Sequence, residues 1–147
     1  MSTTLNSARA SSFKMKAVHW LWPDRFALGK LGILAGLPDE GKGQVFANMA
    51  ATVTQGSEWP CGEGIAPQGN VILLTAEDDC NDTVVPRLAA AGANLDRIEI
   101  VKMVRDNKGD RPFNLAQDLD LQRHVEVGNV NLVQTDPNHG ISRRQVR

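Results

Sequence analysis

A glycine-rich stretch at residues 31–44 contains the side chains with the clearest chemical potential. Gly36, Gly41 and Lys42 have the spacing G-x-x-x-x-G-K, between an apolar run and a segment with helical periodicity. A loop that leads into a helix can direct successive backbone N–H groups at phosphate oxygens, and the helix dipole favours negative charge there. A lysine at this position reaches the terminal phosphates. The spacing therefore predicts a phosphate-binding loop, with an ordinary glycine-rich turn as the alternative.

The loop departs from the usual pattern at one position and is unusually acidic. The residue after the lysine is usually Ser or Thr, whose hydroxyl holds Mg²⁺, and here it is Gly43. Asp39 and Glu40 are expected to point outward, because carboxylates that face phosphates would weaken binding. The residues predicted to bind the nucleotide phosphates are Gly36, Pro38, Asp39, Glu40, Gly41, Lys42, Gly43 and Gln44.

Acidic residues follow two of the predicted strands. Within the predicted strand at residues 70–75, Val71–Leu74 form a continuous apolar run, which is typical of a strand covered on both faces, and Glu77 comes soon after the strand. Asp136 follows a weaker, later strand. Ligands of open α/β sheets bind at the carboxyl ends of the strands, so both carboxylates are expected on the same edge as the loop. Glu77 is the candidate to orient or deprotonate a water, and Asp136 is the candidate to hold Mg²⁺ through water. For Asp78 and Asp79, a solvated pair at a helix start is the simpler explanation.

The elements that would position these residues alternate strand and helix. Gly56 and Gly92 are the expected ends of the first two helices, and Pro86 is acceptable only in the first turn of its helix. The order predicts α/β, with a mainly parallel sheet and right-handed crossovers. The predicted strands are residues 30–35, 70–75, 97–101 and 131–135; the predicted helices are residues 43–55, 82–91 (with Asn81 or Asp82 as cap) and 115–127; residues 105–111 are predicted to be a turn or mobile loop.

The composition excludes several other classes. At 147 residues, of which 41% are hydrophobic, the chain can bury the core of one domain. With a net charge of −1, the chain as a whole does not attract nucleic acid electrostatically. Binding of DNA by a local basic patch or in the central channel of an oligomer is still compatible with this charge. Cys61 and Cys80 lack the spacing of a disulfide framework or a zinc site. With no 18-residue apolar run and no signal peptide in the sequence, we expect a cytoplasmic protein that does not contact a membrane.

The motifs gather in three segments: Leu34–Lys42, Gly69–Asp79, and Pro86–Leu88 with Ala91–Ala93. Together they resemble the RecA-like AAA ATPases of plasmids, phages and mobile elements, and are similar to plasmid RepA-type hexameric replicative helicases. The resemblance implies a three-layer RecA-like P-loop NTPase fold, with Lys42 as the Walker A lysine. It also implies Glu77 as the catalytic glutamate and Asp136 as the Walker B aspartate. ATP and Mg²⁺ are the implied cofactors, and single-stranded DNA and a hexamer are the implied partners.

The resemblance covers residues 17–137 and then stops. Members of that family continue after the Walker B Asp-Pro with more strands, a sensor residue and an arginine finger, so we expect a fold that is incomplete at its C-terminus, as in a truncated copy. The expected organisation is a disordered leader at 1–16, the ATPase core at 17–137 and a polar tail at 138–147. The first functional hypothesis is an ATP-binding domain linked to DNA replication or unwinding by a mobile element, with ATP hydrolysis if the site is competent. The alternatives are a truncated nucleotide-binding or interaction module without hydrolysis, and a relic with an open sheet edge.

Overall fold

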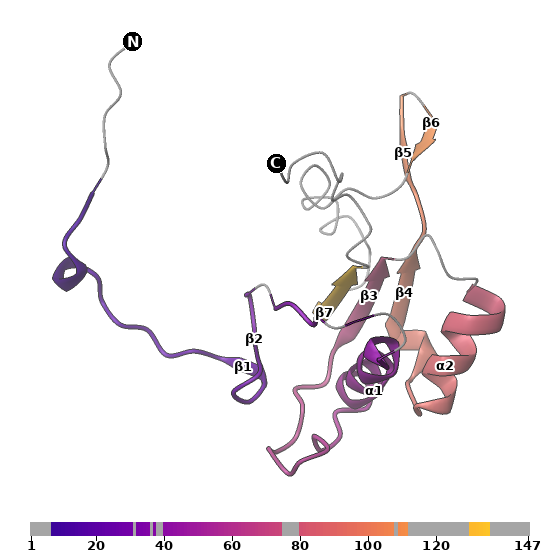
Figure 1. Ribbon diagram of the computed structural model, residues 1–147, viewed down its shortest axis with the longest axis horizontal. Coiled ribbons are helices and arrows are strands. Elements are labelled where there is room, and N and C mark those ends of the chain that lie inside the picture. The colour runs from indigo at the N-terminus through magenta and orange to yellow at the C-terminus, as the bar shows by residue number, and fades with distance from the viewer. Residues whose placement is uncertain are drawn as a thin grey trace.

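A parallel sheet with the strand order β4–β3–β7 forms the centre of the fold (Figure 1). The structure is a computed structural model that describes residues 7–30, 32–35, 37, 40–74, 80–107, 109–111 and 130–135. Its strands and α-helices are β1 (Trp20–Trp22), β2 (Phe26–Ala27), α1 (Lys42–Gln55), β3 (Asn70–Leu74), α2 (Val85–Ala90), β4 (Ile98–Val101), β5 (Val104–Asp106), β6 (Gly109–Arg111) and β7 (Val130–Thr135). The short helical turns are η1 (Ala10–Ser12), η2 (Cys80–Val84) and η3 (Leu95–Arg97).

The central strand β3 pairs in parallel with both neighbours. Successive side chains of a strand point to opposite faces of the sheet, and both faces of β3 are buried. Val71 and Leu73 belong to the core that includes residues of α1 and α2, whereas Ile72 and Leu74 pack with partly buried residues of β4, β5 and β7. This arrangement confirms the prediction that the apolar run of this strand is covered on both sides.

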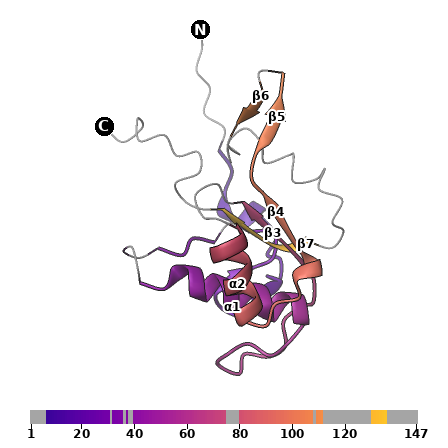
Figure 2. The same cartoon turned by 90° about the vertical axis from the view of Figure 1, so that its right-hand side faces the viewer.

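The two helices lie side by side on one face of the sheet (Figures 1 and 2). α1 agrees with its prediction within one residue, and Gly56 ends it in a left-handed conformation with φ 63°. Val45, one of the apolar residues of α1, is 42% exposed. None of the described helices has the length and hydropathy that crossing a membrane requires.

The second helical segment begins earlier than predicted. A π-helical turn at η2 leads directly into α2, with Pro86 in the first turn of α2 as the sequence requires. Asp82 is therefore inside the helical segment and not at its cap, and its carboxylate accepts a hydrogen bond from the Thr83 hydroxyl at 2.8 Å. Gly92, at φ 81°, follows the last turn as expected.

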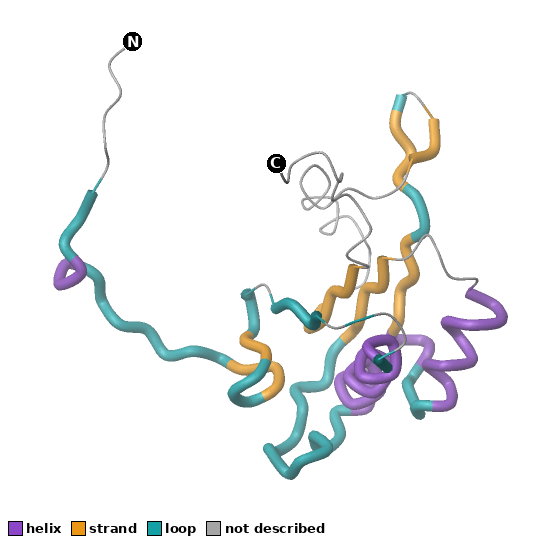
Figure 3. Tube along the Cα trace, in the orientation of Figure 1, coloured by secondary structure: helices purple, strands orange, loops and turns teal. Residues whose placement is uncertain are grey.

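The predicted first strand at residues 30–35 is wrong for the part of it that the structure describes. Residues 32–35 have no strand pairing and are drawn as loop (Figure 3). Ile33 is 81% exposed and Leu34 is 44% exposed. Gly32 lies against the ring of Phe26, so closely that an added Cβ would be 2.4 Å from Phe26 Cδ1. An apolar run predicts burial, but a strand also needs a partner strand that offers hydrogen bonds, and β7 pairs with β3 alone in the described sheet.

Tryptophans close the core below the sheet. Trp22 stacks on Trp59 with ring centroids 4.4 Å apart, and both are buried. Trp22 is thus a core residue, while Trp20 stays 40% exposed on the same strand. The predicted turn at 105–111 lies in the β5–β6 hairpin, where Arg105 pairs with Asp110 at 2.7 Å. The predicted helix at 115–127 and the predicted tail at 138–147 lie outside the described residues.

Candidate phosphate-binding site

Helix α1 begins at a backbone conformation that only glycine adopts readily. Gly41 is the N-cap residue and has φ 82° and ψ 13°, in the left-handed region that disfavours residues with a Cβ. Its carbonyl accepts the N–H groups of Gln44 at 2.9 Å and Val45 at 3.0 Å. The first N–H groups of a helix have no acceptor within the helix, so this end of α1 can donate to an anion.

Two charged side chains of the loop hold the peptide groups of Leu37. The Lys42 ammonium donates to the Leu37 carbonyl at 2.5 Å, and the Leu37 N–H donates to Glu40 Oε2 at 2.7 Å. Glu40 is exposed, and its orientation relative to a bound phosphate stays a prediction. Its carboxylate turns back onto the loop, because a loop N–H takes the nearest acceptor, and here a carboxylate lies only three residues away.

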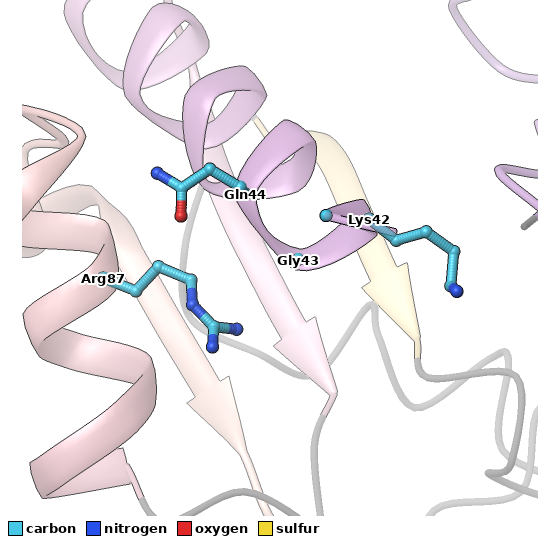
Figure 4. Close-up of a pocket in the computed structure, with 5 residues that line it drawn as sticks. Lys42, Gly43, Gln44 and Arg87 are labelled. Carbon is cyan, nitrogen blue, oxygen red and sulfur yellow. The ribbon is translucent and has the colours of Figure 1, made fainter. Parts of the chain in front are cut away.

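A hollow of about 340 Å³ opens beside the helix start. It is lined by Gly41, Lys42, Gly43, Gln44 and Arg87. Figure 4 shows the Lys42 side chain and the Arg87 guanidinium on opposite sides of Gly43. Four of the eight predicted phosphate-binding residues thus line one hollow together with an arginine of α2 that the sequence reasoning did not place there.

Strands β3 and β7 end at the same edge of the sheet. Leu74, the last residue of β3, pairs with Thr135, the last residue of β7, and the two strands are parallel. Glu77 follows Leu74 closely, and Asp136 directly follows Thr135. Of the predicted site, Glu77 and Asp136 lie outside the described residues, as do Gly36, Pro38, Asp39, Asp78 and Asp79.

A comparison with protein families identifies the chain's relatives. The family model described as AAA domain matches residues 3–143. The chain belongs to this AAA domain family. Searches of curated proteins and of solved structures found no match. Membership supports an ATP-binding domain of AAA type, and the mixed α/β fold with the parallel order β4–β3–β7 is compatible with a P-loop fold.

The described residues of this AAA domain fit the phosphates of a nucleotide better than they fit a metal. Backbone N–H groups, Lys42 and Arg87 offer donors and positive charge around the hollow. Mg²⁺ prefers oxygen ligands, and Gly43 has no side-chain oxygen at the position where a hydroxyl usually binds it. No cluster of three or more His, Cys, Asp or Glu side chains occurs among the residues that the structure describes.

The orientation of Glu40 leads to a prediction for the AAA domain. Changing Glu40 to Gln keeps an oxygen that can accept the Leu37 N–H but removes a negative charge from the loop. We expect ATP affinity to rise about threefold to fivefold, because a unit charge at about 4 Å in a solvated site costs roughly 1 kcal/mol. Isothermal titration calorimetry at low salt measures the change.

A charge-matched control separates this local effect from net charge. Glu99 is an exposed residue of β4, and Glu99→Gln removes the same charge outside the loop. Its ATP affinity should equal that of the wild type. Equal affinities of Glu40→Gln and wild type would show that the Glu40 carboxylate does not oppose the phosphates.

Proposed function

We propose that this AAA domain binds ATP with its phosphates at the N-terminus of α1. The observation that carries the proposal is the left-handed Gly41 turn, which opens α1 beside a hollow lined by Lys42 and Arg87. An anion in this position meets the positive end of the helix dipole and the backbone N–H groups of the first turn. Lys42 releases the Leu37 carbonyl and moves to the β and γ phosphates when ATP binds.

The remaining roles extend the proposal to residues at the sheet edge. Glu77 orients or deprotonates the water that attacks the γ-phosphate, and Asp136 holds Mg²⁺ through water. Gly36, Pro38 and Asp39 complete the loop around the phosphates. In this form the chain is a RecA-like ATPase core, spanning 17–137, that works in the cytoplasm on single-stranded DNA as part of a hexamer during replication or unwinding by a mobile element.

A second candidate function is nucleotide binding without hydrolysis. Gly43 favours it, because the missing hydroxyl removes a direct Mg²⁺ ligand from the loop. Such a module would use ATP as a structural or regulatory ligand.

The experiment that tests ATP binding compares the wild type with Lys42→Ala. We expect saturable ATP binding by the wild type and a loss of at least about tenfold in affinity in the variant, because a charge-assisted contact to phosphate contributes roughly 1.5–3 kcal/mol. Lys16→Ala is the matched control, since Lys16 is an exposed lysine that precedes β1. A folded wild type that binds no ATP, or equal affinities of the two lysine variants, would contradict the proposal.

ATP turnover separates the two candidate functions. Release of phosphate by the wild type, abolished in Lys42→Ala, supports the ATPase. Binding without phosphate release supports the module.

A further inference from the structure

Arg87 contributes a positive charge to the hollow, and the ATP binding proposed above gives this side chain no specific role. It lies on α2, between Pro86 in the first turn and the buried Leu88, so the packing of α2 against α1 carries it to the hollow. Its guanidinium has no hydrogen bond and no ion pair with any residue that the structure describes. It nevertheless lies beside Gly43 at the start of α1, which is the positive end of the helix dipole. A cation is unfavourable there unless an anion accompanies it, so a negatively charged ligand would stabilise the arrangement.

The space that the guanidinium takes is available only because residue 43 is glycine. A Cβ at this position would be 2.7 Å from Arg87 Nη1 and 3.5 Å from Cζ. A serine or threonine would place its hydroxyl beyond that Cβ, so the guanidinium in its present position and a metal-binding hydroxyl exclude each other. The arginine end group is flexible, so a serine at 43 would displace it without unfolding α1.

We propose that Arg87 replaces the missing hydroxyl and its metal by binding the terminal phosphate oxygens of the nucleotide directly. The inference rests on the ATP binding proposed above and deepens it. A guanidinium presents a planar fork of N–H donors that matches phosphate oxygens in pairs, and it supplies a fixed positive charge where a bound cation would otherwise stand. Lys42 and Arg87 then hold the phosphates from opposite sides of Gly43 (Figure 4). Nucleotide binding by this chain is consequently tolerant of Mg²⁺ removal.

The test measures ATP affinity of the full chain in excess EDTA and in excess Mg²⁺. The wild type should bind ATP with affinities that differ less than about threefold between the two conditions. Arg87→Ala should lose about 10- to 100-fold in EDTA, as expected for a hydrogen bond to a charged group, and Arg87→Lys should lose less. Arg97→Ala is the matched control, because Arg97 bonds Asn70 at 3.3 Å, at the other end of β3. Thermal unfolding of each variant reports whether it is folded.

Restoring the hydroxyl gives the complementary result. In Gly43→Ser, which displaces the guanidinium, ATP binding should become at least about tenfold weaker in EDTA than in Mg²⁺. Equal EDTA affinities of wild type and both folded Arg87 variants, or binding by Gly43→Ser that is as tolerant of EDTA as the wild type, would overturn the role of Arg87. In either case a persisting loss in Lys42→Ala leaves the proposed ATP site intact, whereas no ATP binding by the folded wild type overturns both.

Discussion

Replacing Trp59 with alanine is expected to lower the free energy of unfolding by about 3–5 kcal/mol, as for other large aromatic side chains removed from a core. Trp59 is 1% exposed, and its ring stacks on Trp22 at 4.4 Å with an interplanar angle of 4°. Its indole N–H also donates to the Leu21 carbonyl at 3.1 Å. The side chain thus ties the loop after α1 to strand β1, and its removal leaves both a cavity and an unpaired carbonyl. Urea unfolding followed by circular dichroism measures the change without relying on tryptophan fluorescence.

Two further variants resolve what Trp59 contributes. Trp59→Phe keeps an aromatic ring against Trp22 but loses the indole N–H, so it should cost about 1–3 kcal/mol. Trp20→Ala removes a tryptophan that is 40% exposed from strand β1, and it should cost no more than about 1 kcal/mol. If Trp59→Ala were no more destabilising than Trp20→Ala, the tryptophan stack would not be part of the stable core.

The features that sequence patterns predicted well are those set by local rules. The apolar residues of α1 have helical spacing, and Gly56 ends the helix in a left-handed conformation. Both ends of α1 therefore lie within one residue of the prediction. Residues Val71–Leu74 of β3 are all apolar and are buried on both faces, and that pattern is visible without knowing the neighbouring strands. The parallel direction of β3 and β7 agrees with the mainly parallel sheet that the alternation of strands and helices predicts.

The features that were missed depend on contacts between distant parts of the chain. The run at residues 32–35 is apolar enough for a strand, but no described strand pairs with it. Arg87 reaches the hollow only through the packing of α2 on α1, and its single sequence signal was its place in the third resemblance segment, beside Pro86. From the sequence alone, Gly43 indicates only a missing Mg²⁺ ligand. In the structure, the absence of a side chain at this position leaves room for the Arg87 guanidinium.

Changing Glu77 to Gln is expected to produce the largest functional effect, a fall of about 10²–10⁴ in the rate of ATP turnover with ATP binding retained. A general base or water-orienting carboxylate contributes a factor of this size, and an amide of the same shape can neither accept the proton nor hold the charge. The expectation rests on topology, because β3 and β7 are parallel and their last residues, Leu74 and Thr135, are paired. The chain that follows β3 therefore leaves the sheet at its carboxyl edge, where open α/β sheets bind ligands. Single-turnover phosphate release and ATP titration measure the two quantities separately.

The control for Glu77 is its neighbour Asp79, whose change to Asn removes the same charge two residues later in the chain. If Asp79 belongs to a solvated helix start, Asp79→Asn should turn over ATP within about twofold of the wild type, since exposed charges contribute little. A large loss of turnover in Asp79→Asn with no loss in Glu77→Gln would show that Asp79, and not Glu77, is the catalytic carboxylate. Equal turnover in Glu77→Gln and wild type would remove Glu77 from the reaction. A wild type that binds ATP through Lys42 and releases no phosphate would instead mean that the AAA domain uses ATP as a ligand, which is the function that Gly43 favours.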